Sequence, residues 1–275
     1  MRNPLVVGNW KLHRSLRANR LLLSELKVSL NALTQTEVAL CLPYVYLFQA
    51  QQLLHDSHIR WGAQNVSQFE EGAYTSCISA QMVAEFGCKY TIIGHSERRA
   101  LKLESNQVAA KRLMNALNAN LTPIFCVGET LEERESGIAE HIVKNQMLNV
   151  VYGLDDAHFA LARKLNMVIA YEPVWAIGTG HHAAPDQAQS MHAFIRGLLA
   201  ERDPLFASQV RIIYGGSMTP QNAQGLLSMP DIDGGLVGRA SLTAKDFVAI
   251  CQTAENIADY AQLPPKSTRA HFLAG

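Results

Sequence analysis

The chain has 275 residues, of which 48% are hydrophobic and 17% charged, and its 24 Lys and Arg residues balance 24 Asp and Glu residues. A neutral chain lacks the basic face or tail of proteins that bind nucleic acid or an anionic membrane, so we expect neither partner. The composition suits a large buried core and excludes a disordered chain. Length alone fits two domains or one α/β barrel of about 250 residues.

Short apolar segments alternate with amphipathic stretches along the chain. Continuous apolar segments are typical of parallel strands covered on both faces. Eight of them with no linker between predict a single-domain α/β fold, a (β/α)8 barrel over residues 1–261, and residues 262–275 are expected to form a tail. The predicted strands are Leu5–Val7, Val38–Leu42, Ile59–Ala63, Tyr90–Ile93, Pro123–Val127, Val168–Tyr171, Val210–Tyr214 and Gly235–Val237. The predicted amphipathic stretches include Leu21–Leu26, Asn106–Leu117, Ile138–Val151, Gln187–Leu199 and Phe247–Tyr260.

Five cysteines lie at positions 41, 77, 88, 126 and 251 and include no C-x-x-C pair. Scattered thiols in odd number indicate neither a disulfide framework nor a zinc cage, so a reducing cytoplasm is the expected compartment. The first residues lack the features of a signal peptide, and no stretch approaches the roughly 18 apolar residues of a membrane span. His181, His182 and His192 have no interleaved carboxylate or cysteine, so no metal site is expected there.

The chemically distinctive residues follow the predicted strands, whose C-terminal ends open on one face of a parallel barrel. His95 lies in GHSERR (94–99), directly after the strand Tyr90–Ile93. A histidine at a helix N-terminus feels the positive end of the helix dipole, which favours a neutral ring able to donate a hydrogen bond to a carbonyl oxygen. A structural histidine is the alternative, but the strand-end position and the Ser-Glu-Arg-Arg that follows favour a site residue.

Glu172 lies in AYEPVWAIGTG (170–180), at the end of another apolar strand. Trp175 and Ile177 are expected to surround the Glu172 carboxylate with apolar side chains. Such surroundings disfavour the charged form and raise the pKa, as a proton-abstracting base requires. A proline entry, an apolar tip and a glycine exit predict a loop that closes and excludes water. An ordinary surface loop with a solvated glutamate would leave the two apolar side chains unexplained.

Two glycine-containing strings, YGGS (214–217) and LVGRAS (236–241), follow the last two strands. Backbone N–H groups there suit a phosphate, which barrels commonly bind at this place, although tight turns would explain either string alone. After the first strand, GNWKLH directs Asn9 and Lys11 to the same side, although most single lysines are simply solvated. Together these strings predict a phosphate-binding barrel mouth.

The strings as a set resemble the triosephosphate isomerase family, in the family's order and from residue 2 to about residue 260. The resemblance implies a homodimeric enzyme that interconverts dihydroxyacetone phosphate and D-glyceraldehyde 3-phosphate through an enediolate, without a metal or an organic cofactor. The strings are GNWK (8–11), GAQNVS (62–67), GAYT (72–75), GHSERR (94–99), CVGET (126–130), AYEPVWAIGTG (170–180), YGGS (214–217) and PDIDG (230–234).

The resemblance also implies a role for each site residue. Glu172 would be the base that moves a proton between C1 and C2. His95 would be the neutral group that polarises the carbonyl, and Lys11 the cation that holds the anionic substrate. Further substrate-binding positions are implied at Asn9 and, for the phosphate, at Gly178, Ser217, Gly238 and Arg239.

Four departures from the family's pattern stand out. Arg239 replaces a glycine, and a required positive φ would make arginine cost about 1–2 kcal/mol there. Ser76–Cys77 replaces Gly-Glu in the loop that inserts into the neighbouring subunit, so an ion pair to Arg98 is expected to be lost and the homodimer kept. His181 and His13 replace a lysine and an asparagine, changes that can alter loop kinetics but remove no reacting group.

Two other functions remain open at this point. One is a catalytically silent barrel that binds a phosphosugar or a partner, which the joint presence of Lys11, His95 and Glu172 disfavours. The other is a different phosphate-binding barrel isomerase, whose base and acid would not be expected on these loops.

Overall fold

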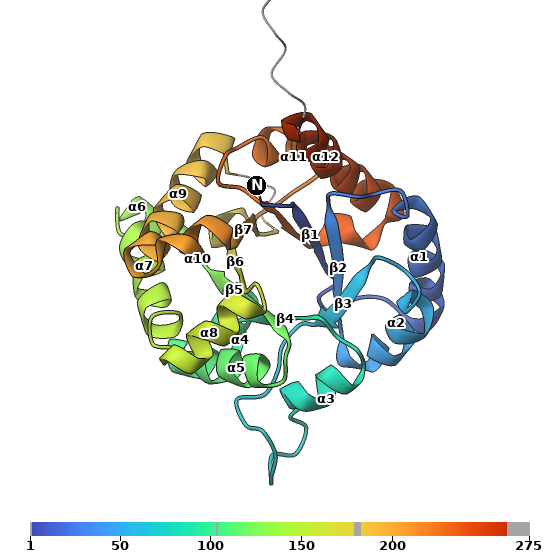
Figure 1. The fold of residues 1–275 in the computed structure, drawn as a ribbon, viewed down its shortest axis with the longest axis horizontal. Helices are drawn as coiled ribbons and strands as arrows, with labels where there is room; N and C mark the ends of the chain where they lie inside the picture. The colour runs from blue at the N-terminus through green and yellow to red at the C-terminus, as the bar shows by residue number, and fades with distance from the viewer. Residues whose placement is uncertain (1, 103, 179–182, 263–275) are drawn as a thin grey trace, which may run out of the picture.

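The computed structural model describes residues 2–102, 104–178 and 183–262. Eight parallel strands pair in chain order, and β8 pairs with β1 to close a barrel, which confirms the predicted fold. Figure 1 shows the strands at the centre of the molecule with the helices around them. The strands are β1 (Leu5–Asn9), β2 (Glu37–Leu42), β3 (Arg60–Ala63), β4 (Tyr90–Ile93), β5 (Thr122–Val127), β6 (Val168–Tyr171), β7 (Arg211–Tyr214) and β8 (Gly234–Val237).

The helices form the outer layer, and several begin at a residue whose side chain accepts a free backbone N–H. Ser15 caps α1, Ser105 caps α5 and Asp155 caps α8 in this way, which satisfies donors that the first turn leaves unpaired. The α-helices are α1 (Leu16–Ser29), α2 (Leu47–Leu54), α3 (Ala80–Glu85), α4 (Ser96–Lys102), α5 (Asn106–Asn118), α6 (Leu131–Glu135), α7 (Ala139–Val150), α8 (Asp156–Lys164), α9 (Pro185–Arg202), α10 (Pro204–Gln209), α11 (Pro220–Leu227) and α12 (Ala244–Gln262). Single turns of 3-10 helix are η1 (Tyr44–Tyr46), η2 (Val174–Ala176) and η3 (Arg239–Leu242).

Two apolar layers hold the barrel together. Alternate strand residues such as Val7, Ile92 and Ile213 fill its interior. The residues between them, such as Phe125 and Ile169, pack outward against the helices in a second, larger cluster. Because both faces of the strands are buried, the strands read as continuous apolar segments in the sequence.

The connections at the carboxyl ends of the strands carry the distinctive residues, and one of them, residues 64–79 between β3 and α3, projects from the lower edge of the molecule in Figure 1. No helix in the described ranges is both long enough and apolar enough to span a membrane. The last helix, α12, extends to Gln262, and residues 263–275 of the expected tail lie outside the described residues, so the division at residue 261 stays a prediction.

Candidate active site

A cleft of about 520 Å³ opens at the carboxyl ends of the strands. Its walls come from the connections after β1, β4, β6, β7 and β8, which the closed parallel barrel brings together from the whole length of the chain. Glu172 lies beside the cleft, in contact with His95. The other predicted site residues all line it: Asn9, Lys11, His95, Gly178, Ser217, Gly238 and Arg239.

Glu172 and His95 form a buried pair, with 1% and 6% of their surfaces exposed. His95 Nε2 lies 3.0 Å from Glu172 Oε1, and the Ser96 N–H donates to Glu172 Oε2 at 2.8 Å. The carboxylate is therefore held at both oxygens, by the Ser96 N–H at the start of α4 and by the His95 ring.

The pKa of Glu172 reflects opposing influences. Burial, the largest of them, raises the pKa, but the His95 ring and the Ser96 N–H together hold it below its ordinary value. The sequence-based expectation of a raised pKa is therefore wrong for this position of the carboxylate. The reason is that a neighbouring imidazole and a donated N–H stabilise the charged form more than burial destabilises it.

The ring of His95 is oriented by the backbone of α4. Its Nδ1 accepts the Glu97 N–H at 3.2 Å, so this nitrogen carries no proton and the neutral ring is protonated on Nε2. Burial lowers the pKa of His95, and the neighbouring Glu172 carboxylate, followed by Glu97, raises it above the ordinary value overall. In the neutral ring, His95 Nε2 therefore carries the proton, and this nitrogen faces Glu172 Oε1.

Lys11 has a φ of 50°, a left-handed conformation that is uncommon for lysine. Its N–H donates to Asn9 Oδ1 at 3.1 Å, and Gln64 Nε2 donates to its carbonyl oxygen at 2.9 Å. Its ammonium pairs with Glu97 Oε1 at 2.6 Å. A Cβ atom added to Gly238 would lie 3.8 Å from Lys11 Nζ. The cation is therefore fixed between the start of α4 and the turn after β8.

The residues expected to bind phosphate lie along the β6, β7 and β8 side of the cleft. Gly178 has a φ of 71°, and the Ser217 N–H donates to Ala176 O at 3.0 Å. Arg239 begins η3 without a positive φ, so the backbone strain considered from the sequence does not arise. Its exposed side chain has no ion-pair partner in the part of the chain that the structure describes.

The connection that follows Glu172 is anchored on the neighbouring strand's loop. Trp175 Nε1 donates to Glu129 Oε1 at 2.9 Å. Arg134 pairs with the same carboxylate at 2.8 Å and lies over the Trp175 ring, 5.3 Å from its centre. The indole N–H of Trp175 is therefore held by Glu129. The pairing across two loops could not be read from the AYEPVWAIGTG string alone.

Several residues that hold the predicted ones received no role from the sequence. They are Ser96, Glu97, Gln64 and Glu129, and each lies in a string that carries the family resemblance. Their partners come from other strands, so only the closed barrel reveals the contacts. Gly180, His181 and His182, which were discussed from the sequence, belong to residues 179–182, and these lie outside the described residues.

Comparisons with known proteins agree with this geometry. The triosephosphate isomerase family matches residues 4–254. Triosephosphate isomerase of Thiobacillus denitrificans is 53% identical over 254 residues, which span 92% of this chain and 99% of that protein. Triosephosphate isomerase of Nitrosococcus oceani is 51% identical over 254 residues, which span 92% of this chain and 100% of that protein. The crystal structure of triosephosphate isomerase from Bartonella henselae has a TM-score of 0.82 at 35% identity, covering 91% of this chain and 98% of that one. This chain therefore belongs to the triosephosphate isomerase family, and it is an isomerase.

Proposed function

We propose that this isomerase interconverts dihydroxyacetone phosphate and D-glyceraldehyde 3-phosphate, with Glu172 as the base. His95 donates from Nε2 to the carbonyl oxygen, and Lys11 stabilises the negative charge of the enediolate and of the phosphate. The observation that carries the assignment is the 3.0 Å approach of Glu172 Oε1 to His95 Nε2 at the edge of a cleft lined by Lys11. A carboxylate, an imidazole N–H and an ammonium around one small ligand suit proton transfer next to a carbonyl.

The proton transfer requires Glu172 to leave the Ser96 N–H. Away from this donor and from Nε2 of His95, the carboxylate loses the groups that lower its pKa, and burial then raises the pKa toward that of an effective base. Glu172 takes a proton from one carbon, which leaves an enediolate and a carboxylic acid. It returns the proton to the neighbouring carbon, while His95 Nε2, having given its proton to the former carbonyl oxygen, recovers a proton from the hydroxyl on the other oxygen. The C=O and O–H groups thus exchange places, and the reaction consumes neither water nor a net proton.

The phosphate is assigned to the N–H groups of Gly178, Ser217, Gly238 and Arg239. The Ser217 N–H donates to Ala176 O. Exchange of that bond for a phosphate oxygen would couple substrate binding to movement of the connection that begins after Glu172. An enediolate phosphate readily loses phosphate in water, so closure over the cleft would protect the intermediate as well as strengthen the local electrostatics.

The alternatives are distinguished by one coupled assay of triose phosphate interconversion. Turnover in both directions supports the proposal. Binding of inorganic phosphate without any turnover would instead identify a silent phosphosugar-binding barrel, and turnover of only a larger phosphosugar would identify another barrel isomerase. The comparisons favour neither alternative.

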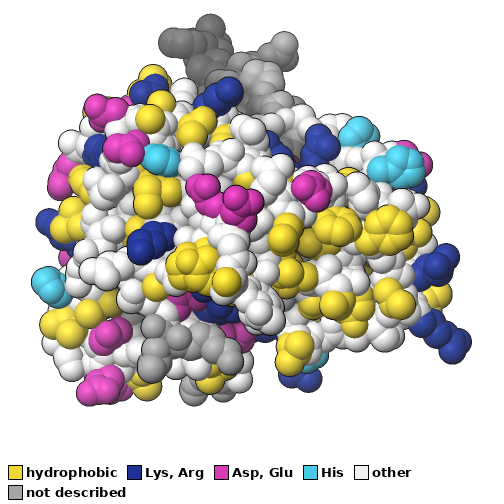
Figure 2. Space-filling model, turned by 90° about the horizontal axis from the view of Figure 1, so that it is seen from below, with side chains coloured by type: hydrophobic (Ala, Val, Ile, Leu, Met, Phe, Trp, Pro, Cys, Tyr) yellow, Lys and Arg dark blue, Asp and Glu magenta, His cyan; other side chains and the backbone are white. Residues whose placement is uncertain are grey.

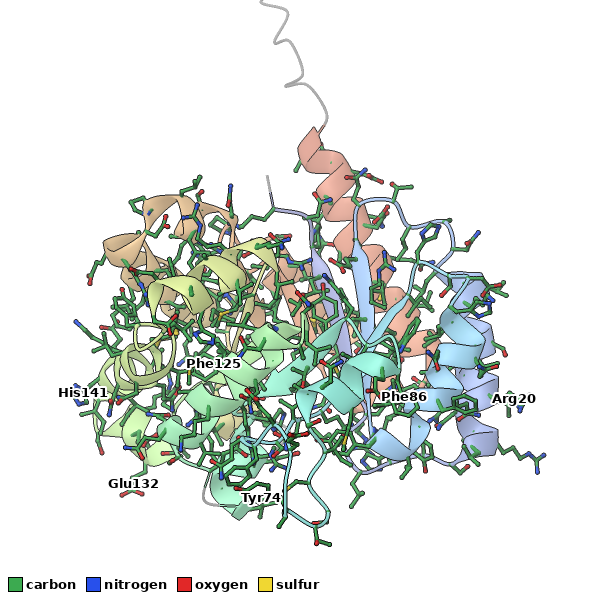
Figure 3. All side chains as sticks on the ribbon, turned by 60° about the horizontal axis from the view of Figure 1, so that its bottom comes forward. Arg20, Tyr74, Phe86, Phe125, Glu132 and His141 are labelled. Atoms are coloured by element: carbon green, nitrogen blue, oxygen red, sulfur yellow. The ribbon has the colours of Figure 1, made fainter. Side chains whose placement is uncertain are left out.

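We also propose that two copies of the chain form a homodimer through the side around residues 64–79. In this connection the rings of Phe69 and Tyr74 stack with centres 3.7 Å apart. Phe48, Tyr74, Met82 and Phe86 are exposed, and Figure 2 shows hydrophobic side chains gathered on this side of the molecule. Figure 3 labels Tyr74 on the projecting connection and Phe86 next to α3. An exposed apolar surface of this kind suits a second copy of the chain.

The departure at Ser76–Cys77 leaves this interface without the glutamate that the family usually places there. Arg98 has a partner within its own chain, Glu104 Oε2 at 2.8 Å, and Arg112 shares that carboxylate at 2.5 Å. The guanidinium of Arg98 is therefore compensated without a cross-subunit pair. The burial of apolar side chains then provides the free energy of association between the two copies.

We further propose that the enzyme works in the cytoplasm. All five cysteines are free thiols, and four of them are buried. Free thiols persist in a reducing compartment. Recovery of the protein in a periplasmic or membrane fraction of the source cell would contradict this location.

A further inference from the structure

Arg14 joins two connections of the cleft through its side chain. Its Nη1 donates to Leu242 O at 3.0 Å, and its Nη2 donates to Ala18 O at 3.0 Å. Leu242 is the last residue of η3, which begins at Arg239, and Ala18 lies in the first turn of α1. One planar guanidinium therefore ties the turn after β8 to the segment that follows Lys11.

The backbone of Arg14 is fixed as well. Its φ is 89°, a left-handed conformation that is unfavourable for a side chain of this size. The Tyr46 hydroxyl donates to Arg14 O at 3.1 Å, and the guanidinium lies over the buried Trp10 ring, 5.4 Å from its centre. A strained backbone persists only where its surroundings hold it. The contacts of Arg14 on three sides supply that restraint.

The two segments that Arg14 joins carry groups assigned to the substrate's phosphate. Lys11 lies three residues before Arg14. The Lys11 ammonium is close to the Gly238 turn, because a Cβ added to Gly238 would lie 3.8 Å from Lys11 Nζ. The turn itself is braced because Gly238 O accepts both the N–H and the hydroxyl of the buried Ser241, at 2.9 and 2.6 Å. Arg14 adds a link from the segment that follows Lys11 to the last residue of η3, beyond this braced turn.

We propose that Arg14 is a positioning residue that sets the spacing between the Lys11 ammonium and the Gly238–Arg239 N–H groups, and thereby the affinity for a phosphate dianion. The inference rests on the proposed function, in which these groups bind the phosphate. A guanidinium fork holds two carbonyl groups at once in a fixed geometry, which a lysine ammonium on a flexible stem does not. Glu172 and His95 lie in the connections after β6 and β4, so loss of the fork weakens phosphate binding more than proton transfer.

The test compares Arg14→Lys and Arg14→Gly with the wild type and with Arg17→Lys. Lysine keeps the charge without the fork, and glycine removes the side chain while relaxing the positive φ, so folding is retained. Arg17 is an exposed neighbour on α1 whose side chain makes no hydrogen bond or ion pair in the described ranges, which makes it the matched control. The readouts are kcat and KM in the coupled assay, the affinity for inorganic phosphate by calorimetry, and the melting temperature.

Both Arg14 variants are expected to raise KM and to weaken phosphate binding in parallel by about tenfold, with a much smaller change in kcat. Arg17→Lys is expected to match the wild type in every readout. Folded Arg14 variants with unchanged KM and phosphate affinity overturn the inference, even if their melting temperature falls. A wild type without isomerase activity refutes the proposed function instead, and calorimetry with phosphate still decides the role of Arg14.

Discussion

Two buried residues near the barrel strands carry different charges because different groups lie beside them. Glu172 is stabilised in its charged form by the Ser96 N–H and the His95 ring. His192 is fully buried on α9, where burial outweighs the groups that support a charged ring. Its Nδ1 lies 3.0 Å from Asp231 O, and its Nε2 has no partner among the described residues. Burial lowers the pKa of His192 to about 4, so the ring is neutral at pH 7.

His192 should make the protein less stable in mild acid. In the unfolded chain its pKa returns to about 6.5, so between pH 6.5 and 4 the unfolded state binds a proton that the folded state does not. Stability is therefore fully present above pH 6.5 and falls as the pH decreases, by about 2 kcal/mol at pH 5. Urea unfolding of the wild type and of His192→Gln at pH 7 and pH 5 measures this contribution. An equal loss in both proteins would contradict it.

Ser76 offers a stabilising substitution. Its φ of 75° lies in the left-handed region, where glycine has no side-chain penalty. Ser76→Gly is expected to increase the free energy of unfolding by about 1 kcal/mol. The matched control is Ser136→Gly, because Ser136 has an ordinary φ of −76° and glycine should bring no gain there. Thermal or urea unfolding measures both, and a gain in the control alone would refute the argument.

At the scale of elements, the sequence predicts the strands well and the short helices poorly. Each predicted strand lies within two residues of the observed one, because burial on both faces makes the strands continuously apolar. Helices α3 and α10 have six residues each, which is too few to display a helical period. The site residues could be placed at the mouth, because strand ends converge there. The direction of the Glu172 pKa shift could not be predicted, because it is caused by His95 and Ser96, which follow β4 and are distant from Glu172 along the chain.

The connection after β6 can be tested through its glycine. Among the described residues, no atom lies within 4 Å of a Cβ added to Gly178, whose φ is 71°. Gly137, which follows α6 outside the cleft, has a φ of 74° and equal space. Alanine at either position should lower stability by about 1 kcal/mol through backbone strain alone. Only Gly178→Ala should also raise KM severalfold, because it stiffens a segment assigned to the phosphate. Steady-state kinetics on both variants measure the two KM values. Equal KM values would show that Gly178 does not contribute to phosphate binding.

At the scale of the whole molecule, closure of the barrel creates the site. Asn9 and Gly238 come from opposite ends of the chain, yet they line one cleft because β1 pairs with β8. Closure also leaves no unpaired strand edge, so association must use the outer loops and helices. The exposed apolar side around residues 64–79 is the candidate surface.

The association is expected to depend on that surface. Wild-type protein should sediment as a dimer at micromolar concentration, and Tyr74→Asp should sediment as a monomer, because a buried unpaired carboxylate is unfavourable in an apolar interface. Leu148→Asp changes a residue of equal exposure, 43% for both, on α7, away from the projecting connection, and should remain dimeric. An active wild-type monomer at this concentration would refute the dimer.

The most direct measurement of the central claim is the turnover of D-glyceraldehyde 3-phosphate by Glu172→Gln, with calorimetry of inorganic phosphate binding on the same sample. Glutamine keeps the shape of the side chain but cannot accept the proton. We predict a fall in kcat of about a thousandfold with phosphate affinity retained. Wild-type turnover in this variant would show that another group takes the proton and would contradict the assignment of Glu172, His95 and Lys11 to one reacting centre.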